Sequence, residues 1–352
     1  MKSNYNYTSE FILESGEKLD GITITYSDYG PVDAERTIWV CHALSGTSEV
    51  LDWWAGLFGN KQLFDPKQDR IICANVLGSC YGTTGAQDFE KPLEFPLVTI
   101  KDMVKAHQLL ADHLNLSKID LLIGASLGGQ QAVEWAVTNP DFVNGLILIA
   151  TNASHSPYAR AFNEVQRLAL QADQTFGDKN GGQNGLKAAR AIAMMSYRSY
   201  TDFSLKQSEK EPKADDFKSA SYVRYQGEKF VNRFNAYAYY YLSKAMDSHD
   251  VLRGRSGSYE SVLKEIKART LVIGIDSDSL FPIEEQRFLH KNIPESEYGL
   301  IESAHGHDSF LIDYDKLNIL IRNFLRQEPI GKIVEAKSET KTLLKRKINY
   351  LI

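Results

Sequence analysis

Short apolar runs and amphipathic stretches alternate along the first 150 residues of the chain. The runs are rich in Val, Ile and Leu, which is typical of strands buried on both faces of a sheet. They lie at residues 37–41, 70–76, 119–123 and 145–150. The stretches with apolar residues at helical spacing are residues 50–64, 99–114 and 130–137. This alternation predicts a mostly parallel sheet covered by helices on both faces, preceded by an amino-terminal hairpin around Glu14–Glu17.

The pattern changes between residues 156 and 250, where helical spacing continues but no strand is predicted. The expected helices of this part are residues 159–173, 186–200 and 228–246. Strands and helices alternate again afterwards, at residues 270–275, 283–291, 297–301 and 310–327. We therefore predict a discontinuous α/β core formed by residues 1–155 and 251–352, interrupted by an all-helical lid formed by residues 156–250.

The sequence Gly124-Ala125-Ser126-Leu127-Gly128 joins a predicted strand to a predicted helix. A G-x-S-x-G motif in this context is typical of a nucleophile elbow, a sharp turn that exposes the serine at the carboxyl end of the sheet. The two glycines leave room for the strained backbone of such a turn. Because the motif also occurs by chance in glycine-rich loops, the case for Ser126 as a nucleophile depends on its partners.

A nucleophilic serine needs a histidine as base and a carboxylate that orients the histidine, and in this type of fold both follow the serine along the chain. The carboxylate is expected directly after the strand at residues 270–275, where Asp276 and Asp278 both qualify. The loop after the last strand offers His305 and His307. Position alone does not separate the two members of either pair.

Backbone N–H groups are expected to stabilise the oxyanion that forms when the serine attacks a carbonyl carbon. One is the N–H of Leu127, directly after the serine, and the second comes from a loop after an earlier strand. That loop is residues 42–47, in which Leu44 is the candidate donor. The alternative interpretation of this loop is a simple strand-to-helix turn.

Composition limits the kinds of partner. With 40 Lys and Arg against 45 Asp and Glu, the formal net charge is −5, so small molecules are expected partners and nucleic acid and membranes are not. The three cysteines and eight histidines lack metal-ligand spacing, so neither a metal site nor a bound cofactor is expected.

The first residues do not form a signal peptide and no run of 18 apolar residues occurs, which favours a cytoplasmic location. Residues 331–352 include a basic stretch compatible with a solvated or docking helix.

Several blocks of the sequence are similar to the homoserine O-acetyltransferases, acyltransferases of methionine biosynthesis with the α/β-hydrolase fold. The blocks run in the family's order from about residue 40 to 312. They are His42-Ala43-Leu44-Ser45-Gly46, Asn75-Val76-Leu77-Gly78-Ser79-Cys80-Tyr81-Gly82-Thr83-Thr84-Gly85, residues 95–102, residues 124–135, Ser196-Tyr197-Arg198-Ser199, Asp278-Ser279-Leu280-Phe281-Pro282 and Gly306-His307-Asp308-Ser309-Phe310-Leu311. The resemblance implies an α/β-hydrolase fold with an inserted helical lid. It also implies that Asp278 is the acid and His307 the base that act with Ser126.

The resemblance further implies that Arg198 binds the carboxylate of an amino-acid substrate and that Asp308 binds its ammonium group. A zwitterion needs one protein charge of each sign, which fits this pair. The alternative role of Arg198 is a surface ion pair. Ser79 stands where the family usually has glycine, and the loop at residues 84–94 is shortened. These departures leave the acyl donor and the acceptor open.

The activity implied by the resemblance is ping-pong transfer of an acetyl group from acetyl-CoA, a co-substrate, to L-homoserine through an acyl-Ser126 intermediate. The helical lid is expected to exclude water, which separates a transferase from an esterase. A homodimer formed through the lid is also implied. The alternatives are a succinyl donor, a serine acceptor, a carboxylesterase of the same fold, and an inactive scaffold that only binds its ligand.

Overall fold

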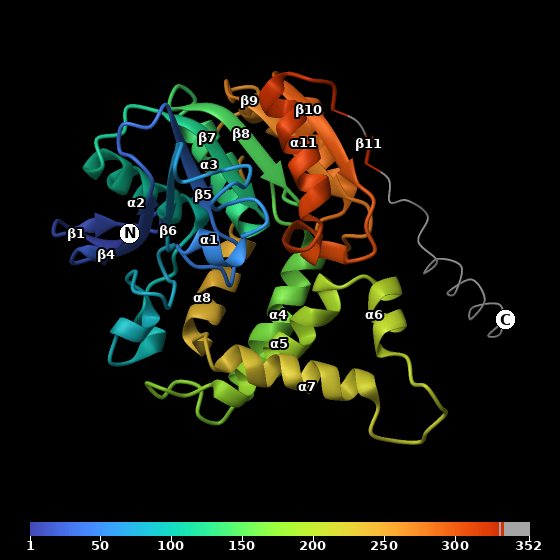
Figure 1. Cartoon of the computed structure of the whole chain (residues 1–352). Coiled ribbons are helices and arrows are strands. Elements are labelled where there is room, and N and C mark those ends of the chain that lie inside the picture. The colour runs from blue at the N-terminus through green and yellow to red at the C-terminus, as the bar shows by residue number, and fades with distance from the viewer. Residues whose placement is uncertain (331, 334–352) are drawn as a thin grey trace.

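The computed structural model describes residues 1–330 and 332–333, and a nine-stranded sheet lies at its centre (Figure 1). Across the sheet the strands follow the order β1-β4-β6-β5-β7-β8-β9-β10-β11. Their bounds are β1 (Lys2–Tyr7), β4 (Ile22–Tyr29), β5 (Arg36–Cys41), β6 (Asp69–Ala74), β7 (Ile119–Ala125), β8 (Val143–Ile149), β9 (Arg269–Ile275), β10 (Ser296–Ile301) and β11 (Lys332–Ile333). Strand β4 is antiparallel to β1 and β6, and the remaining neighbours are parallel. The predicted α/β fold with a mostly parallel sheet is confirmed.

Helices cover both faces of the sheet (Figure 1). Helices α2 (Ile100–His113), α3 (Leu127–Thr138) and α10 (Ile283–Asn292) contribute to one hydrophobic cluster, and α1 (Val50–Trp53) and α11 (Tyr314–Arg326) contribute to a second. Successive side chains of a strand point to opposite faces, so Trp39 and Cys41 of β5 belong to the first cluster and Ile38 and Val40 to the second. This two-sided burial explains the continuous apolar runs in the sequence.

The remaining elements are short or lie between β8 and β9. The predicted hairpin forms from β2 (Phe11–Ile12) and β3 (Lys18–Leu19). Three 3₁₀ helices occur in the described chain, at Ala86–Asp88, Pro92–Glu94 and Gly306–Leu311. Between β8 and β9, a stretch that is described throughout, the chain forms α4 (Pro157–Gln171), α5 (Gln183–Tyr197), α6 (Tyr200–Gln207), α7 (Lys218–Val231), α8 (Ala236–Asp247) and α9 (Tyr259–Leu263).

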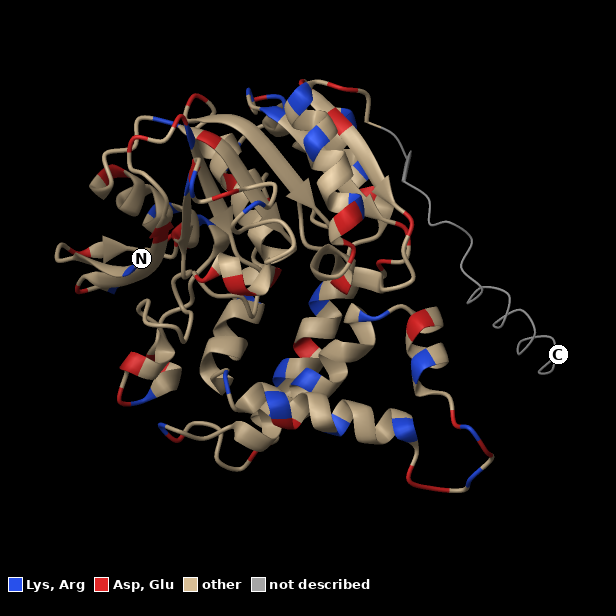
Figure 2. Cartoon of the chain, in the orientation of Figure 1, with Lys and Arg blue, Asp and Glu red and all other residues tan. Residues whose placement is uncertain are grey.

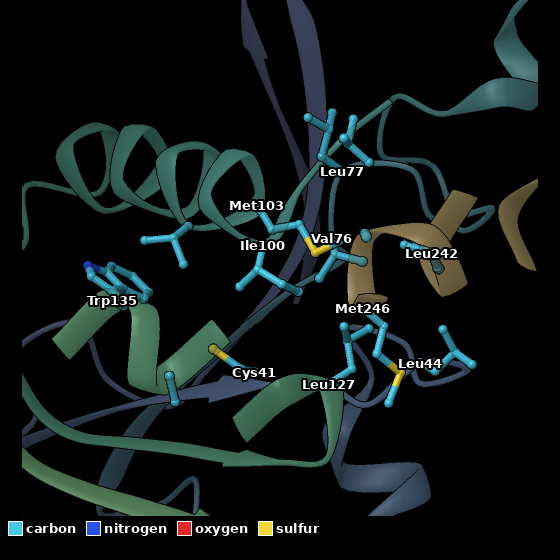
Figure 3. Packing of buried hydrophobic residues seen from close by; sticks show 14 of the residues in the cluster. Cys41, Leu44, Val76, Leu77, Ile100, Met103, Leu127, Trp135, Leu242 and Met246 are labelled. Carbon is cyan, nitrogen blue, oxygen red and sulfur yellow. The ribbon is translucent and has the colours of Figure 1, made fainter. Parts of the chain in front are cut away.

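Helices α4 to α8 lie together at one end of the sheet, and we call residues 156–250 the helical segment (Figure 1). Its contact with the core includes α8, whose Leu242 and Met246 pack in the same cluster as Leu44 and Leu127 (Figure 3). Leu44 and Leu127 are the two predicted oxyanion donors, so α8 packs next to the candidate site. The division of the chain into a core and a lid stays a prediction.

The helix predicted at residues 50–64 is wrong beyond its first turn, because α1 ends at Trp53. A Cβ atom on Gly56 would lie 2.1 Å from the ring of Tyr314, and Gly59 has a φ of +136°, so this stretch is a tightly packed loop. Its apolar residues are buried all the same, as the spacing suggested. Trp54 donates its indole N–H to the carbonyl oxygen of Phe310 at 2.8 Å.

Other predicted helix boundaries shift for local reasons. The predicted helix 228–246 is two helices, because Asn235 caps α8 and its side-chain oxygen accepts the N–H groups of Tyr237 and Ala238 at 2.9 and 3.1 Å. Helix α6 was not predicted and begins after the capping residue Ser199. The predicted helix 310–327 is a 3₁₀ helix followed by α11. Of the tail at residues 331–352, for which a basic helix was suggested, Lys332–Ile333 form β11 and the other residues lie outside the described ones.

Charged residues of both signs are interspersed over the helices, whereas the central strands carry few of them (Figure 2). Such a mixture is typical of an ordinary solvated surface rather than of a face that binds a polyanion. Within the described residues, no helix combines the length and the apolar character needed to span a membrane.

Candidate active site

Ser126 is the single residue between β7 and α3. Its φ of 57° and ψ of −126° are unusual for a residue with a side chain and indicate local strain. Hydrogen bonds hold this backbone: the Ser126 N–H donates to Ile149 O at 3.0 Å, and Ser126 O accepts from the Thr151 hydroxyl at 3.0 Å and from the Gln130 N–H at 3.1 Å. The turn places the Ser126 side chain on the wall of a cavity.

The two glycines of the motif are required by close packing around this turn. A Cβ atom on Gly124 would lie 2.1 Å from the carbonyl oxygen of Gly128, and one on Gly128 would lie 2.0 Å from that of Cys41. Both obstacles are backbone atoms, which cannot move aside as a flexible side chain can. The glycines therefore allow α3 to start directly against the end of β5.

The structure brings Ser126, His307 and Asp278 together. His307 Nδ1 lies 2.6 Å from Asp278 Oδ2, and His307 Nε2 lies 2.9 Å from Ser126 Oγ. A carboxylate only accepts, so Nδ1–H donates to Asp278 and Nε2 is left to accept the proton of Ser126. The other carboxylate oxygen of Asp278 accepts the N–H groups of Leu280 and Phe281, both at 2.9 Å, which fixes its orientation.

Asp276 and His305, the alternative candidates for the acid and the base, lie apart from Ser126. Asp276 accepts the N–H of Ser303 at 2.8 Å and thereby supports the loop after β10. His305 lies 3.3 Å from Asp202 of α6. Of the two candidates in each pair, the structure therefore places Asp278 and His307 in the hydrogen-bonded chain with Ser126. These are the two residues that the resemblance implied.

Opposing effects act on the imidazole of His307. Its burial lowers the pKa, but the charge of Asp278 and the hydrogen bond to it outweigh burial, and the pKa lies above the ordinary value of 6.5. The ring also stacks on Phe281 with centroids 5.1 Å apart. A fixed ring that readily takes a proton from Ser126 suits general base catalysis.

Leu127 and Leu44, the predicted oxyanion donors, flank Ser126 from two elements. Leu127 is the first residue of α3, where the backbone N–H has no partner within the helix. The loop with Leu44 is anchored by His42, whose Nδ1–H donates to Ala43 O at 2.8 Å and whose Nε2 accepts the Val76 N–H at 3.1 Å. Burial lowers the pKa of His42 to about 4, so the ring is neutral and can make both bonds. In the sequence, nothing marked His42 for this role.

Core and helical segment both line the cavity in front of Ser126. Among the lining residues are Leu44, Leu280, His307 and Asp308 from the core and Asn163, Arg190, Tyr197 and Met246 from the helical segment. Its volume is about 150 Å³. The space accommodates a small molecule beside the serine, and access is restricted by α4, α5 and α8.

The charged residues predicted for substrate binding occupy different positions. Asp308 lines the cavity, and its burial raises the pKa although the charge of Arg198 opposes this. Arg198 lies 3.2 Å from Asp308 through its Nε, but its side chain lines a neighbouring cavity with Asp202 and Lys206. The Ser126 cavity is lined instead by Arg190 of α5 and, at its rim, by Arg233.

Arg190 was not singled out from the sequence, because an arginine on an amphipathic helix is usually solvated. Its guanidinium carbon lies 5.3 Å from the ring centroid of Tyr197 and 4.7 Å from that of Phe230. Its buried Nε has no hydrogen-bond partner within the described chain. A buried guanidinium N–H without an acceptor suits an anionic ligand group.

Comparison with known proteins places this geometry in a family. The family model of the alpha/beta hydrolase fold matches residues 36–314. A homoserine O-acetyltransferase from Cyclobacterium marinum is 45% identical over 89% of this chain and 92% of that protein. The chain belongs to the homoserine O-acetyltransferase family. Another member, from Chloroherpeton thalassium, is 40% identical over 95% of this chain and 92% of that protein. The crystal structure of the family member from Staphylococcus aureus is 28% identical, with a TM-score of 0.80 over 98% of this chain and 99% of that one.

A second carboxyl group of this family member, that of Glu285, is itself perturbed by its surroundings near the site. Burial raises the pKa of Glu285 to about 7, although Asn152 Nδ2 donates to its carboxylate at 2.9 Å, and the charge of Asp278 adds to the effect. The folded state therefore binds the proton more tightly than the unfolded state, whose ordinary value is 4.5. The contribution of Glu285 to the free energy of unfolding is therefore fully present below pH 4.5 and is lost as the pH rises through about 7.

Glu285→Gln is expected to raise the melting temperature by about 2–4 °C above pH 7.5, because the amide keeps an acceptor for Asn152 without carrying a charge. At pH 4 the variant and the wild type are expected to melt at the same temperature. Thermal unfolding followed by circular dichroism across this range measures the difference. Glu284→Gln, on the exposed side of the same helix, is the control. A gain that is equal at both pH values would contradict the assignment.

Proposed function

We propose that this protein is a cytoplasmic homoserine O-acetyltransferase that moves an acetyl group from acetyl-CoA to L-homoserine. The observation that carries the proposal is the hydrogen-bonded chain from Asp278 through His307 to Ser126 on the wall of a small cavity that also holds Asp308 and Arg190. Membership of the family supports the choice of reaction.

In the first half of the reaction, Ser126 attacks the thioester carbonyl carbon of acetyl-CoA. His307 Nε2 takes the hydroxyl proton as the new C–O bond forms. The negative charge that develops on the carbonyl oxygen is stabilised by the N–H groups of Leu127 and Leu44. The C–S bond then breaks, His307 returns the proton to the sulfur, and CoA leaves as its thiol.

In the second half, the hydroxyl of homoserine occupies the place of the departed thiol. Its oxygen attacks the acetyl carbon while its proton passes to His307, and the bond to Ser126 Oγ breaks as His307 protonates that oxygen. O-acetylhomoserine is released and Ser126 is regenerated. Water in the same place would give hydrolysis, so closure of the cavity by the helical segment favours transfer.

Two charges on the cavity wall orient the amino acid. Asp308 supplies a carboxylate for the ammonium group, and Arg190 supplies a guanidinium for the carboxylate. Arg198 takes a supporting role, because its ion pair holds Asp308 in position from the adjoining cavity. This assignment replaces the role that the sequence suggested for Arg198.

Arg190→Met is expected to raise the KM for homoserine by roughly 10- to 100-fold, because a hydrogen bond to a charged group is lost. Arg198→Met is the matched variant and is expected to raise it less. Initial rates at varied homoserine and saturating acetyl-CoA give the two values. If Arg198→Met has the larger effect, Arg198 binds the carboxylate and the assignment of Arg190 is wrong.

The reaction is tested by release of free thiol from acyl-CoA. Acetyl-CoA and succinyl-CoA are each assayed alone, with L-homoserine and with L-serine, and the amino-acid product is identified by mass spectrometry. We expect sustained thiol release with acetyl-CoA and homoserine together, and O-acetylhomoserine as the product. Sustained release without an amino acid would instead indicate a hydrolase, and a preference for succinyl-CoA or serine would change the substrate but not the mechanism.

We also propose a homodimer formed through the helical segment. Tyr158, Val165 and Leu168 of α4 have exposed fractions of 58%, 49% and 55%, and their spacing puts them on one side of the helix. Leu168→Asp is expected to give a monomer in light scattering coupled to gel filtration. Ile12→Asp, an exposed position on the β2–β3 hairpin with an exposed fraction of 46%, is the control. A dimer that survives Leu168→Asp would rule out this face.

A further inference from the structure

Arg233 lies on the rim of the Ser126 cavity, in the connection between α7 and α8, and its side chain is exposed. Nη1 donates to the carbonyl oxygen of Ser45 at 3.0 Å and to the hydroxyl of Tyr81 at 3.2 Å. The guanidinium also stacks on Phe230, 4.9 Å from the ring centroid. The position of this arginine is therefore fixed from three sides, although it faces solvent.

The charge of Arg233 is not neutralised by a carboxylate. Two other arginines of the helical segment pair with acidic groups, Arg167 with Asp247 and Arg198 with Asp308. Within the described chain, Arg233 forms no such ion pair. Both of its hydrogen bonds use Nη1, and a guanidinium carries further N–H donors on Nη2 and Nε. A fixed cation at a cavity entrance, with donors to spare, suits a ligand that carries strong acceptors.

We propose that Arg233 binds the acyl donor by donating hydrogen bonds to the amide carbonyl oxygens of its pantetheine arm. This inference rests on the proposed function. The amino-acid end of the cavity already has Arg190 and Asp308, which leaves Arg233 for the second substrate. Its contact with Ser45, the residue after Leu44, puts the guanidinium beside the loop that faces the thioester. The amides are the first acceptors along the arm from the thioester, whereas the phosphates of CoA lie at its far end.

The experiment compares three acetyl donors on the full-length protein. Acetyl-CoA has the arm and the phosphates, S-acetylpantetheine has the arm alone, and p-nitrophenyl acetate has neither. Arg233→Met removes the donors but keeps an apolar stem against Phe230. Lys229→Met is the matched control, because Lys229 is an exposed cation of α7 that does not line the cavity. Acylation rates are measured for each donor and variant.

Arg233→Met is expected to lower kcat/KM for acetyl-CoA and for S-acetylpantetheine by a similar factor of about ten or more, mainly through KM. The rate with p-nitrophenyl acetate and all rates of Lys229→Met are expected to be unchanged. A loss confined to acetyl-CoA would mean that Arg233 contacts phosphate, and equal losses with all three donors would mean that it only supports the Leu44 loop. Either result, or no loss at all, overturns the proposal. Failure of the wild type to react with either thioester would instead refute the proposed function.

Discussion

Ser126→Ala is expected to lower kcat for acetyl transfer by roughly 10⁴-fold or more, because the covalent route disappears with the hydroxyl. Among the described residues, the Ser126 side chain makes a single hydrogen bond, to His307. It occupies a strained turn that alanine also tolerates poorly, but the surrounding packing sets the shape of this turn. We therefore expect a folded variant that still binds both substrates. Wild-type protein mixed with acetyl-CoA alone is expected to gain the mass of one acetyl group.

Intact-protein mass spectrometry, with tryptic mapping, tests for this acetyl-enzyme. The label is expected on Ser126 in the wild type and in Ser221→Ala, an exposed position of α7 that serves as the matched control. It is expected to be absent from Ser126→Ala. Retention of the label on another residue, with activity preserved, would show that Ser126 is not the nucleophile.

Asp278→Asn is expected to lower kcat by roughly 10⁴-fold, because the carboxylate that fixes the tautomer of His307 is lost. An amide in this place can donate to His307 Nδ1, which would leave the proton on Nε2 and prevent that atom from accepting the proton of Ser126. Asp276→Asn is the matched control, since an amide oxygen there still accepts the Ser303 N–H. Comparable losses in both variants would argue against a special role for Asp278.

The same variant is expected to change the pH dependence of the residual activity. His307 must be neutral to act as base, so activity in the wild type falls as the pH drops through a pKa that lies above 6.5. Without Asp278, burial, the largest effect on the ring, lowers its pKa against the charge of Asp308 alone. The acidic limb of kcat/KM is therefore expected to move to lower pH. An acidic limb that stays at the same pH or moves to higher pH would contradict the inference that Asp278 raises the pKa of His307.

Much of the fold follows from local pattern. Continuous apolar runs such as residues 145–150 predict strands that are covered on both faces, and the structure has β8 there. The motif around Ser126 could also be read directly, because strand, turn and helix are contiguous in sequence. The helix predicted at residues 50–64 was wrong beyond its first turn because its packing depends on a distant contact. Its apolar spacing reflects burial in a loop packed against Tyr314, a contact that lies far away in the sequence.

What the sequence by itself determined is the α/β class, the elbow with Ser126 and, through its motifs, the family. Only the tertiary structure decided which partners meet. His307 and Ser126 are 181 positions apart, and their 2.9 Å contact depends on β7, β9 and β10 placing their ends at the same edge of the sheet. Likewise, whether Arg190 or Arg198 faces the cavity depends on where α5 ends and how it packs. Spacing along a chain fixes local conformation, whereas the meeting of distant side chains is fixed by sheet order and packing.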